Sequence, residues 1–361
     1  MQTSKRIGID VRMYNSSGIG RYIRNIVIRL VKEKPQWDFF LLGYECDFVK
    51  NELLNFSNVR VIFCNSYIYG IGEQWELYKK MPSSLDCFWS PHWNIPLLYR
   101  GNLLVSIHDM FHLAHTEYIG AFYKVWYAKL MFKLISKKAN AVITVSNFSK
   151  REIARFTSID IDNINVIYNG IDDKWFHIKK GKKIYPRNYI LYVGNVKPHK
   201  NLVRLVKAFK SIKDDIDCDL IIVGKRDGFV TADNEIKKLV TELEHRVKFT
   251  GYINDYALEQ YYAQANMFVF PSLYEGFGLP PLEAMAAGCK RVLCSNIDCI
   301  REVCGNNVNY FNPLDIDDMA QKMRETFMSE PSILNYNWRN KYKWENSVNS
   351  IENIIEKIIY S

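Results

Sequence analysis

The sequence predicts an α/β protein made of two doubly wound parallel sheets, and two observations predict this fold class. Short apolar runs alternate with longer segments of helical periodicity along the 361 residues, which is the pattern of βαβ units around a parallel sheet. A polar, basic segment at 169–188, interrupted by Gly170, Gly181 and Pro186, separates two such series. Its composition is typical of a linker.

The first series predicts an N-terminal domain over residues 1–170. Its apolar runs predict strands at 6–11, 38–44, 59–64, 86–90, 102–109 and 140–146. Residues 21–34 carry apolar side chains at helical spacing and predict the first helix. Ser146 ends the last of these runs, and its hydroxyl is suited to cap a following helix.

The second series predicts a C-terminal domain over residues 171–340. Its strands are expected at 188–194, 218–224, 246–252, 266–272, 290–295 and 307–311, with helices at about 201–212, 233–244, 255–265, 281–287 and 315–328. Residues 341–361 predict an amphipathic helix that packs back on the N-terminal domain. Two Rossmann-like domains of this kind predict a cleft between them, at the carboxyl ends of the strands.

Charge is unevenly distributed between the predicted domains. The chain holds 48 basic and 39 acidic residues, a net charge of +9. Residues 1–170 hold 21 basic and 14 acidic side chains, against 27 and 25 in the rest. This excess suits an anionic partner of the N-terminal half, such as a membrane surface or a lipid diphosphate. Nucleic acid is not expected, because no recognised nucleic-acid motif accompanies the charge.

The segment 119–138 has two interpretations. It carries Lys124, Lys129, Lys133, Lys137 and Lys138 among several aromatic residues, and helical spacing gathers the lysines on one side. It is either a helix that lies on anionic lipid or a core helix with a solvated face.

Cysteine usage and hydropathy predict the setting of the protein. The sequence contains eight cysteines and no Cys-x-x-Cys pair, so we expect reduced thiols and no metal site. Asp10 and Arg12 lie where a signal peptide needs an apolar run. No uncharged stretch approaches the roughly 18 residues of a membrane span. We expect a cytoplasmic protein, either soluble or peripheral on the inner face of the cytoplasmic membrane.

The stretch FVFPSLYEGFGLPPLEAMAAG, residues 268–288, contains two acids separated by helix-breaking residues. Glycine at 276 and 278 permits close backbone approaches, and Pro280 and Pro281 suit the first turn of a helix. We expect Glu283 in that first turn, where the helix dipole favours an acid. Glu275 precedes the helix, in the loop that follows a strand.

A loop of this kind suits a nucleotide sugar. Backbone N–H groups at a helix start bind phosphate or sugar oxygens, and a carboxylate can accept two hydrogen bonds from a vicinal diol. Glu275 would hold the sugar, Glu283 the ribose, and the backbone of Gly276, Phe277, Gly278 and Leu279 the groups between. The alternatives are an ordinary βα turn with surface acids and a glycosidase acid pair.

The segment EGFGLPPLE, residues 275–283, resembles the donor motif of retaining glycosyltransferases of family 4, which adopt the two-Rossmann GT-B fold. Further segments match this family in order over nearly the whole chain. NSSGIGRY at 15–22 resembles its N-terminal glycine loop, which implies that Gly18 and Gly20 approach the donor or the acceptor. VSIHDMFHLAHTE at 105–117 implies that His108 touches the transferred sugar and that Asp109 supports His108.

The resemblance also extends to the phosphate and base subsites. YVGNVKPHKN at 192–201 resembles the diphosphate loop, which implies Lys200 on the donor phosphates. Asn195 stands where many relatives have arginine, and Lys197 is the candidate for the second charge. VKFTGYI at 247–253, with Tyr252, resembles the segment that meets the base. Trp93 and Tyr99, in 90–100, are either stacking platforms for the acceptor sugar or core aromatics.

The resemblance implies a function for the whole chain. Transfer would proceed with retention at the anomeric carbon by a front-face route, without a metal or other cofactor. GDP-mannose is the first choice of donor and a UDP-sugar the alternative, and a sugar-nucleotide epimerase of the same architecture is the rival enzyme. A lipid-diphosphate-linked glycan is the expected acceptor, in the assembly of an O-antigen or a capsule.

Overall fold

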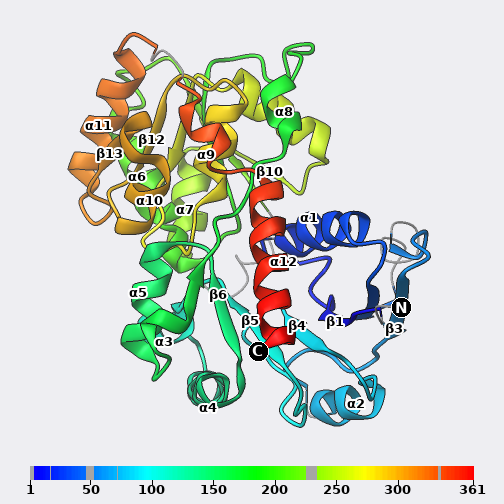
Figure 1. Ribbon diagram of the computed structural model, residues 1–361. Coiled ribbons are helices and arrows are strands. Elements are labelled where there is room, and N and C mark those ends of the chain that lie inside the picture. Colours follow the sequence, from blue (N-terminus) through cyan, green and yellow to red (C-terminus); the bar gives the residue numbers. More distant parts are fainter. Residues whose placement is uncertain (1–3, 17, 46–52, 71, 225–233, 332–334) are drawn as a thin grey trace. The chain divides into compact units, whose positions relative to one another are not determined.

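The computed structural model describes residues 4–16, 18–45, 53–70, 72–224, 234–331 and 335–361 (Figure 1). The chain forms two compact units. Unit 1 comprises residues 1–170 and 341–361, and unit 2 comprises residues 171–340. No helix in the described ranges has the length and apolar character needed to cross a bilayer.

Unit 1 is built on a parallel sheet of seven described strands in the order β3-β2-β1-β4-β5-β6-β7. The strands are β1 (Arg6–Asp10), β2 (Asp38–Gly43), β3 (Val59–Phe63), β4 (Cys87–Ser90), β5 (Leu103–Ile107), β6 (Ala141–Thr144) and β7 (Ile164–Val166). The six runs predicted for this half form β1 to β6. The edge strand β7 was not predicted, because three residues are too few to show a period of two.

Helices α1 (Gly18–Glu33), α2 (Glu73–Lys80), α3 (Phe111–Ala114), α4 (Phe122–Lys138) and α5 (Asn147–Phe156) connect these strands. The prediction that Ser146 caps a helix is confirmed, since its Oγ accepts a hydrogen bond of 3.0 Å from Ser149 N at the start of α5. The predicted start of α1 at residue 21 is wrong, because the helix begins at Gly18.

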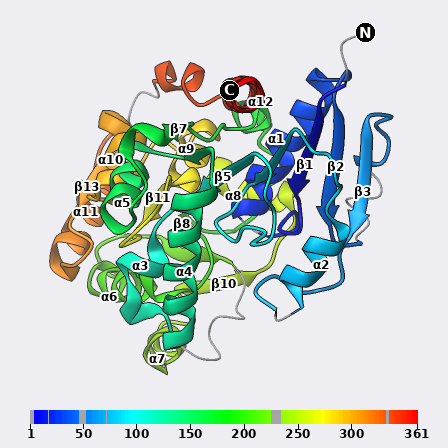
Figure 2. The ribbon, with the colours of Figure 1, turned by 60° about the horizontal axis from the view of Figure 1, so that its bottom comes forward.

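The C-terminal helix α12 (Trp344–Tyr360) packs on α1 within unit 1 (Figures 1 and 2). Its buried face includes Val348, Ile351 and Ile355. Ion pairs join Glu356 to Lys5 at 3.1 Å and Glu345 to Arg29 at 3.3 Å. The helix therefore adds both apolar burial and charge pairing to the N-terminal sheet unit.

Unit 2 contains a parallel sheet of six described strands in the order β10-β9-β8-β11-β12-β13. The strands are β8 (Tyr189–Val193), β9 (Asp219–Val223), β10 (Val247–Gly251), β11 (Met267–Phe270), β12 (Val292–Ser295) and β13 (Asn309–Phe311). The helices are α6 (Leu202–Ile212), α7 (Asn234–Glu242), α8 (Asp255–Gln264), α9 (Leu279–Ala286), α10 (Asp298–Cys304) and α11 (Ile316–Met328). All six predicted strands and all five predicted helices are present. Residue 233, the first of the predicted helix 233–244, lies outside the described ranges. The short helix α10 was missed.

Each sheet has one point where the strand order reverses. In unit 1 this point lies between β1 and β4, and in unit 2 it lies between β8 and β11. Connections leave such a pair of strands in opposite directions, so a crevice opens outside their carboxyl ends, and ligands of doubly wound sheets bind there. The two carboxyl edges are therefore the places to look for a site.

Candidate functional site

In unit 2, two predicted site residues meet at the switch point. Lys200 ends the turn Pro198–Lys200 that follows β8, and Glu275 lies in the loop that follows β11. Lys200 Nζ donates to Glu275 Oε1 at 2.6 Å, and both side chains are largely enclosed, with 19% and 14% of their surfaces exposed. A cation and a carboxylate, 75 residues apart in the chain, are thus in contact where a ligand is expected.

Asn201, which follows β8, joins its own loop to the segments that follow β11 and β13. It adopts a left-handed conformation with φ of 61° and is buried. Its Nδ2 donates to Pro271 O at 3.0 Å and to Pro313 O at 2.7 Å, in the segments that follow β11 and β13. Leu273 N also donates to His199 O at 2.8 Å. Sequence reasoning missed Asn201, although an asparagine directly after the predicted phosphate lysine could have suggested a special backbone position.

The glycine and proline loop after Glu275 has a defined geometry. Gly278 has φ of 95°, a backbone conformation that other residues rarely adopt, and a Cβ at this position would lie 2.4 Å from Ile300 Cδ1, so a substitution would strain the backbone and displace Ile300. Helix α9 begins at Leu279, with Pro280 and Pro281 in its first turn. Because proline has no N–H, Gly278 and Leu279 supply the amides at this helix start.

Glu283 lies in a different environment from Glu275. It is the fifth residue of α9, so its predicted place in the first turn is wrong: the helix begins two residues earlier than expected. Glu283 is buried, and Tyr262 donates its hydroxyl to Glu283 Oε2 at 3.0 Å. The two acids of the motif therefore differ, one paired with Lys200 at the sheet edge and one fixed in the interior.

The remaining predicted donor residues lie on the same edge of unit 2. Asn195 and Lys197 follow β8, and their side chains are exposed. Tyr252 follows β10, directly after Gly251, whose φ is 71°. The surface of Tyr252 is 78% exposed. Phe277 and Gly276 are buried in the loop, and Cys299 of α10 donates its thiol to Phe277 O at 3.2 Å.

In unit 1, His108 lies at the carboxyl end of β5. Its Nε2 is 2.9 Å from Pro91 O, which fixes the tautomer, because a carbonyl can only accept. Desolvation of the ring lowers the pKa of His108, and the hydrogen bond to Pro91 O and the neighbouring Asp109 oppose this only in part. Asp109 Oδ1 accepts from Phe111 N at 2.9 Å, so its carboxylate also stabilises the start of α3.

A buried charged network occupies the switch point of unit 1. The Arg12 guanidinium donates to both oxygens of Asp10, at 2.9 and 2.6 Å, and to Glu73 Oε1 at 2.6 Å. His92 Nε2 lies 3.1 Å from Asp10 Oδ2, and Asn94 Nδ2 donates to Glu73 Oε1 at 2.7 Å. Burial alone would raise the pKa of Asp10, but Arg12 and His92 outweigh burial and hold this pKa well below its usual range.

This network supports the segment that orients His108. His92 Nδ1 accepts from Asn94 N at 3.1 Å, so Nε2 carries the ring proton and donates it to Asp10. Ser90 Oγ donates to His92 O at 2.9 Å. The segment that includes Pro91 is therefore held on both sides of the carbonyl that His108 contacts. Sequence reasoning missed this network, although a buried Asp-x-Arg at a strand end could have indicated it.

The two glycines predicted for a loop lie instead in the first turn of α1. A Cβ at Gly20 would lie 2.5 Å from Tyr14 O, so glycine is required here for packing against the preceding loop. A Cβ at Gly18 would meet nothing within 4 Å. Ser17, between the segment's start and this helix, lies outside the described residues.

The two aromatics predicted for the acceptor lie in different places. Trp93 follows β4 and is half-buried among the rings of Tyr69, His112 and Phe132, at centroid distances of 5.2 to 5.6 Å. Tyr99 packs on Phe88 near the start of β4, with ring centroids 5.5 Å apart. Only Trp93 therefore lies at the carboxyl end of the strands.

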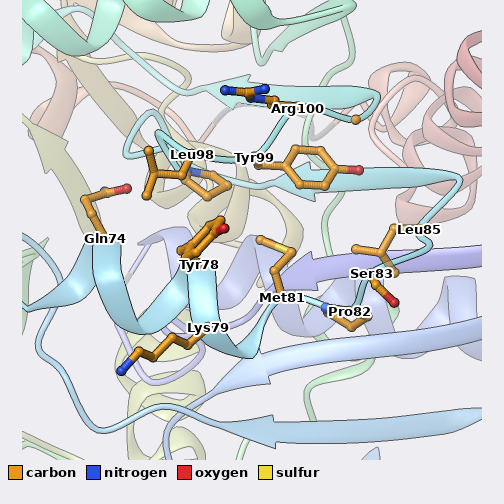
Figure 3. Close-up of a pocket in the computed structure, with 12 residues that line it drawn as sticks. Gln74, Tyr78, Lys79, Met81, Pro82, Ser83, Leu85, Leu98, Tyr99 and Arg100 are labelled. Atoms are coloured by element: carbon orange, nitrogen blue, oxygen red, sulfur yellow. The ribbon is translucent and has the colours of Figure 1, made fainter.

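Tyr99 lines a pocket of about 500 Å³ in unit 1. Figure 3 shows Gln74 and Tyr78 projecting from α2 on one side, and Leu98, Tyr99 and Arg100 on the other. The rest of the lining consists of Lys79, Met81, Pro82, Ser83, Leu85, Pro96 and Gly101. This pocket belongs to the amino-terminal side of the sheet, away from the switch point.

Among the described residues, no group of three or more His, Cys, Asp or Glu side chains is arranged to hold a metal ion. The seven described cysteines are buried free thiols. The expectation that the protein needs no metal stays a prediction.

Two family models match consecutive parts of the chain. The model described as "Glycosyltransferase Family 4" matches residues 16–175, and the model described as "Glycosyl transferases group 1" matches residues 173–343. The chain is 30% identical over 329 residues to the O-antigen chain mannosyltransferase RfbU of Salmonella typhimurium, covering 90% of this chain and 89% of that protein. It is 29% identical over 231 residues to the O-antigen chain mannosyltransferase B of Escherichia coli, covering 58% of each.

Solved structures share the fold. A glycosyltransferase from Rickettsia africae ESF-5 superposes with a TM-score of 0.71 at 19% identity, covering 99% of each chain. Anabaena Alr3699/HepE, solved in complex with UDP and glucose, superposes with a TM-score of 0.74 at 18% identity, covering 98% of this chain and all of the other. At these identities the likeness shows the fold alone, two Rossmann-like parallel-sheet domains of the GT-B type.

Proposed function

The chain belongs to the family of glycosyl transferases group 1 and glycosyltransferase family 4, and on this premise we propose that it transfers mannose from GDP-mannose to a glycan acceptor with retention of configuration. The observation that carries the proposal is the contact between Lys200 and Glu275 at the switch point of unit 2. It brings together one group suited to a diphosphate and one suited to sugar hydroxyls.

When the donor binds, Lys200 and Glu275 would separate, because each would bind a different part of the donor. In the free protein each charge neutralises the other across 2.6 Å. A donor diphosphate carries at least two negative charges and attracts Lys200, which leaves the Glu275 carboxylate to accept hydrogen bonds from the sugar. The amides of Gly278 and Leu279 at the start of α9 lie next to Glu275 in sequence and supply further donors for phosphate oxygens.

The chemical step follows from these charges. The bond from the anomeric carbon to the phosphate oxygen breaks, and its electron pair remains on the diphosphate. The acceptor hydroxyl oxygen forms the new bond on the same face, and its proton passes to the leaving phosphate oxygen. Lys200 and the amides stabilise the charge that develops on this oxygen. His108, with its lowered pKa, is a neutral ring suited to contact the sugar without adding positive charge.

The relatives support the choice of mannose and of a surface polysaccharide. RfbU and mannosyltransferase B are both named for O-antigen chains. A protein of Campylobacter jejuni that is 27% identical over 182 residues, half of this chain, is named for an acceptor on diphospho-undecaprenol. We therefore propose a lipid-diphosphate-linked glycan as the acceptor. The UDP and glucose in the HepE structure favour a UDP-hexose as the second candidate donor.

Thermal unfolding in the presence of EDTA tests the donor. A ligand at about 100 times its dissociation constant adds about 2.7 kcal/mol to the native state, which raises Tm by several degrees. A shift with GDP and GDP-mannose alone supports the proposal, and a shift specific to UDP-sugars would replace the donor. Release of GDP that depends on an added acceptor and persists with EDTA separates transfer from epimerisation and from metal-dependent catalysis.

A further inference from the structure

Helix α4 of unit 1 exposes large aromatic side chains that its core packing does not use. Phe122 is 85% exposed, Tyr123 69% and Trp126 60%. The opposite face of the helix, Val125, Ala128, Met131, Phe132 and Ile135, is buried against the sheet. The helix therefore satisfies its core with one face and keeps an apolar group in contact with solvent on the other.

Topology places these aromatics at the carboxyl edge of the sheet. Helix α4 follows β5 through α3, so its first turn lies near the carboxyl ends of the strands and its last turn leads into β6. Tyr67, Tyr69 and Tyr118 are also exposed, by 83%, 51% and 38%, and they follow the carboxyl ends of β3 and β5. Exposed rings thus collect on the edge that holds the switch point of unit 1.

Lysines continue the same face of α4. Lys129, Lys133 and Lys137 are exposed at helical spacing from Phe122 and Trp126, and residues 111–138 contain a single carboxylate, Glu117. Glu117 Oε1 is engaged by His115 Nδ1 at 2.9 Å. Lys129 and Lys133 also border a pocket of about 420 Å³ whose lining includes the hydroxyl residues Thr157 and Ser158. The face is therefore cationic beside its aromatic end.

We propose that this α4 surface, formed by Phe122, Tyr123, Trp126, Lys129, Lys133 and Lys137, docks on an anionic lipid bilayer. Aromatic rings partition into the interface between headgroups and acyl chains, and lysines bind the lipid phosphates beside them. Charge complementarity selects this occupant, because the face carries three lysines and residues 1–170 have an excess of seven basic side chains. The docking would bring the acceptor-binding edge to a lipid-linked substrate, and this role rests on the proposed function.

Co-sedimentation with vesicles tests the docking without any donor. The purified full chain is mixed with vesicles of phosphatidylcholine, with or without phosphatidylglycerol. We expect binding that requires phosphatidylglycerol and weakens with salt. Replacing Lys129 and Lys133 by Gln should weaken it roughly 25-fold, about fivefold for each lysine near the surface. Replacing Phe122, Tyr123 and Trp126 by Ser should weaken it at least about tenfold.

Matched control variants separate the α4 surface from general charge and hydrophobicity. Lys238→Gln with Lys290→Gln removes two exposed lysines of unit 2. Trp75→Ser with Tyr78→Ser removes two exposed rings of α2, 57% and 55% exposed. Both controls should bind vesicles like the wild type. All replaced side chains are exposed, so unchanged Tm values are expected for every variant.

Three outcomes would overturn the proposal. The first is equal binding to both kinds of vesicle, and the second is equal binding of the α4 and control variants. The third is a dimer, seen by sedimentation velocity, that the aromatic variant abolishes while the wild type does not bind vesicles.

Docking is distinguishable from catalysis. Failure to transfer mannose to a water-soluble acceptor refutes the proposed function and leaves vesicle binding unaffected. Loss of vesicle binding with intact transfer to that acceptor refutes only the docking.

Discussion

The replacement of Glu275 by glutamine separates the sugar subsite from the phosphate subsite. Glutamine keeps an oxygen that Lys200 can reach across 2.6 Å, so the loop geometry should persist. It removes the negative charge that we assign to the sugar hydroxyls. We expect turnover to fall strongly, while the affinity for GDP stays unchanged or rises slightly because Lys200 loses its competing partner.

The magnitude follows from two hydrogen bonds. A hydrogen bond to a charged group contributes about 1.5–3 kcal/mol, and a neutral one about 0.5–1.5 kcal/mol. The charged bond is stronger by about 1–1.5 kcal/mol, so if two sugar hydroxyls donate to Glu275, losing its charge costs about 2–3 kcal/mol in the transition state. Since 1.36 kcal/mol is a tenfold change in rate, kcat should fall about 30- to 160-fold.

The assay measures GDP release from GDP-mannose with acceptor, and GDP affinity by calorimetry. The matched control is Glu242→Gln, which alters another lysine–glutamate pair of unit 2, Lys210 to Glu242 at 2.7 Å, on the exposed surface. This control should retain full turnover. A Glu275→Gln protein that loses GDP affinity by tenfold or more would place Glu275 in the phosphate subsite and refute the reasoning, and so would unchanged turnover.

Three further predictions concern stability. Gly278→Ala should lower Tm more than Gly288→Ala, because both positions have positive φ, 95° and 88°, but only the Cβ at 278 meets a clash. Asn201→Gly keeps the left-handed backbone and loses two buried hydrogen bonds, so it should destabilise unit 2 by about 2–4 kcal/mol. The pKa of Asp10 lies below its unfolded value, so its stabilisation is complete above pH 5. The stabilisation by Asp10 should weaken by about 1 kcal/mol as the pH falls to 3. The Asp10→Asn variant breaks a buried pair with Arg12, so it should be less stable than the wild type at pH 7. It should not show the loss of stability at acid pH that comes from Asp10.

Unfolding in urea and heat decides these three outcomes. Equal Tm losses for the two glycine variants would mean that Ile300 moves aside at no cost. A Tm unchanged in Asn201→Gly would show that the loops after β8 and β11 do not depend on that side chain. An acid loss of stability that persists in Asp10→Asn would assign it to other carboxylates.

The architecture could be predicted from the sequence, because a parallel strand that is buried on both faces is a continuous run of apolar residues. Twelve such runs predicted twelve strands, and the linker composition separated the two series. The short strand β7 and the short helix α10 escaped, since three or seven residues carry little periodicity. Helix starts were off by two or three residues where glycine and proline occupy the first turn, as at Gly18 and Leu279.

The sequence by itself determined the fold class, the motif that separates Glu275 from Glu283 and the cationic character of α4, because each depends on residues close together in the chain. Only the tertiary structure decided which groups meet. The contact of Lys200 with Glu275, the three loops joined by Asn201 and the network around Arg12 all join residues brought together by strand order. Strand order depends on packing across the whole sheet, so no local pattern encodes these contacts.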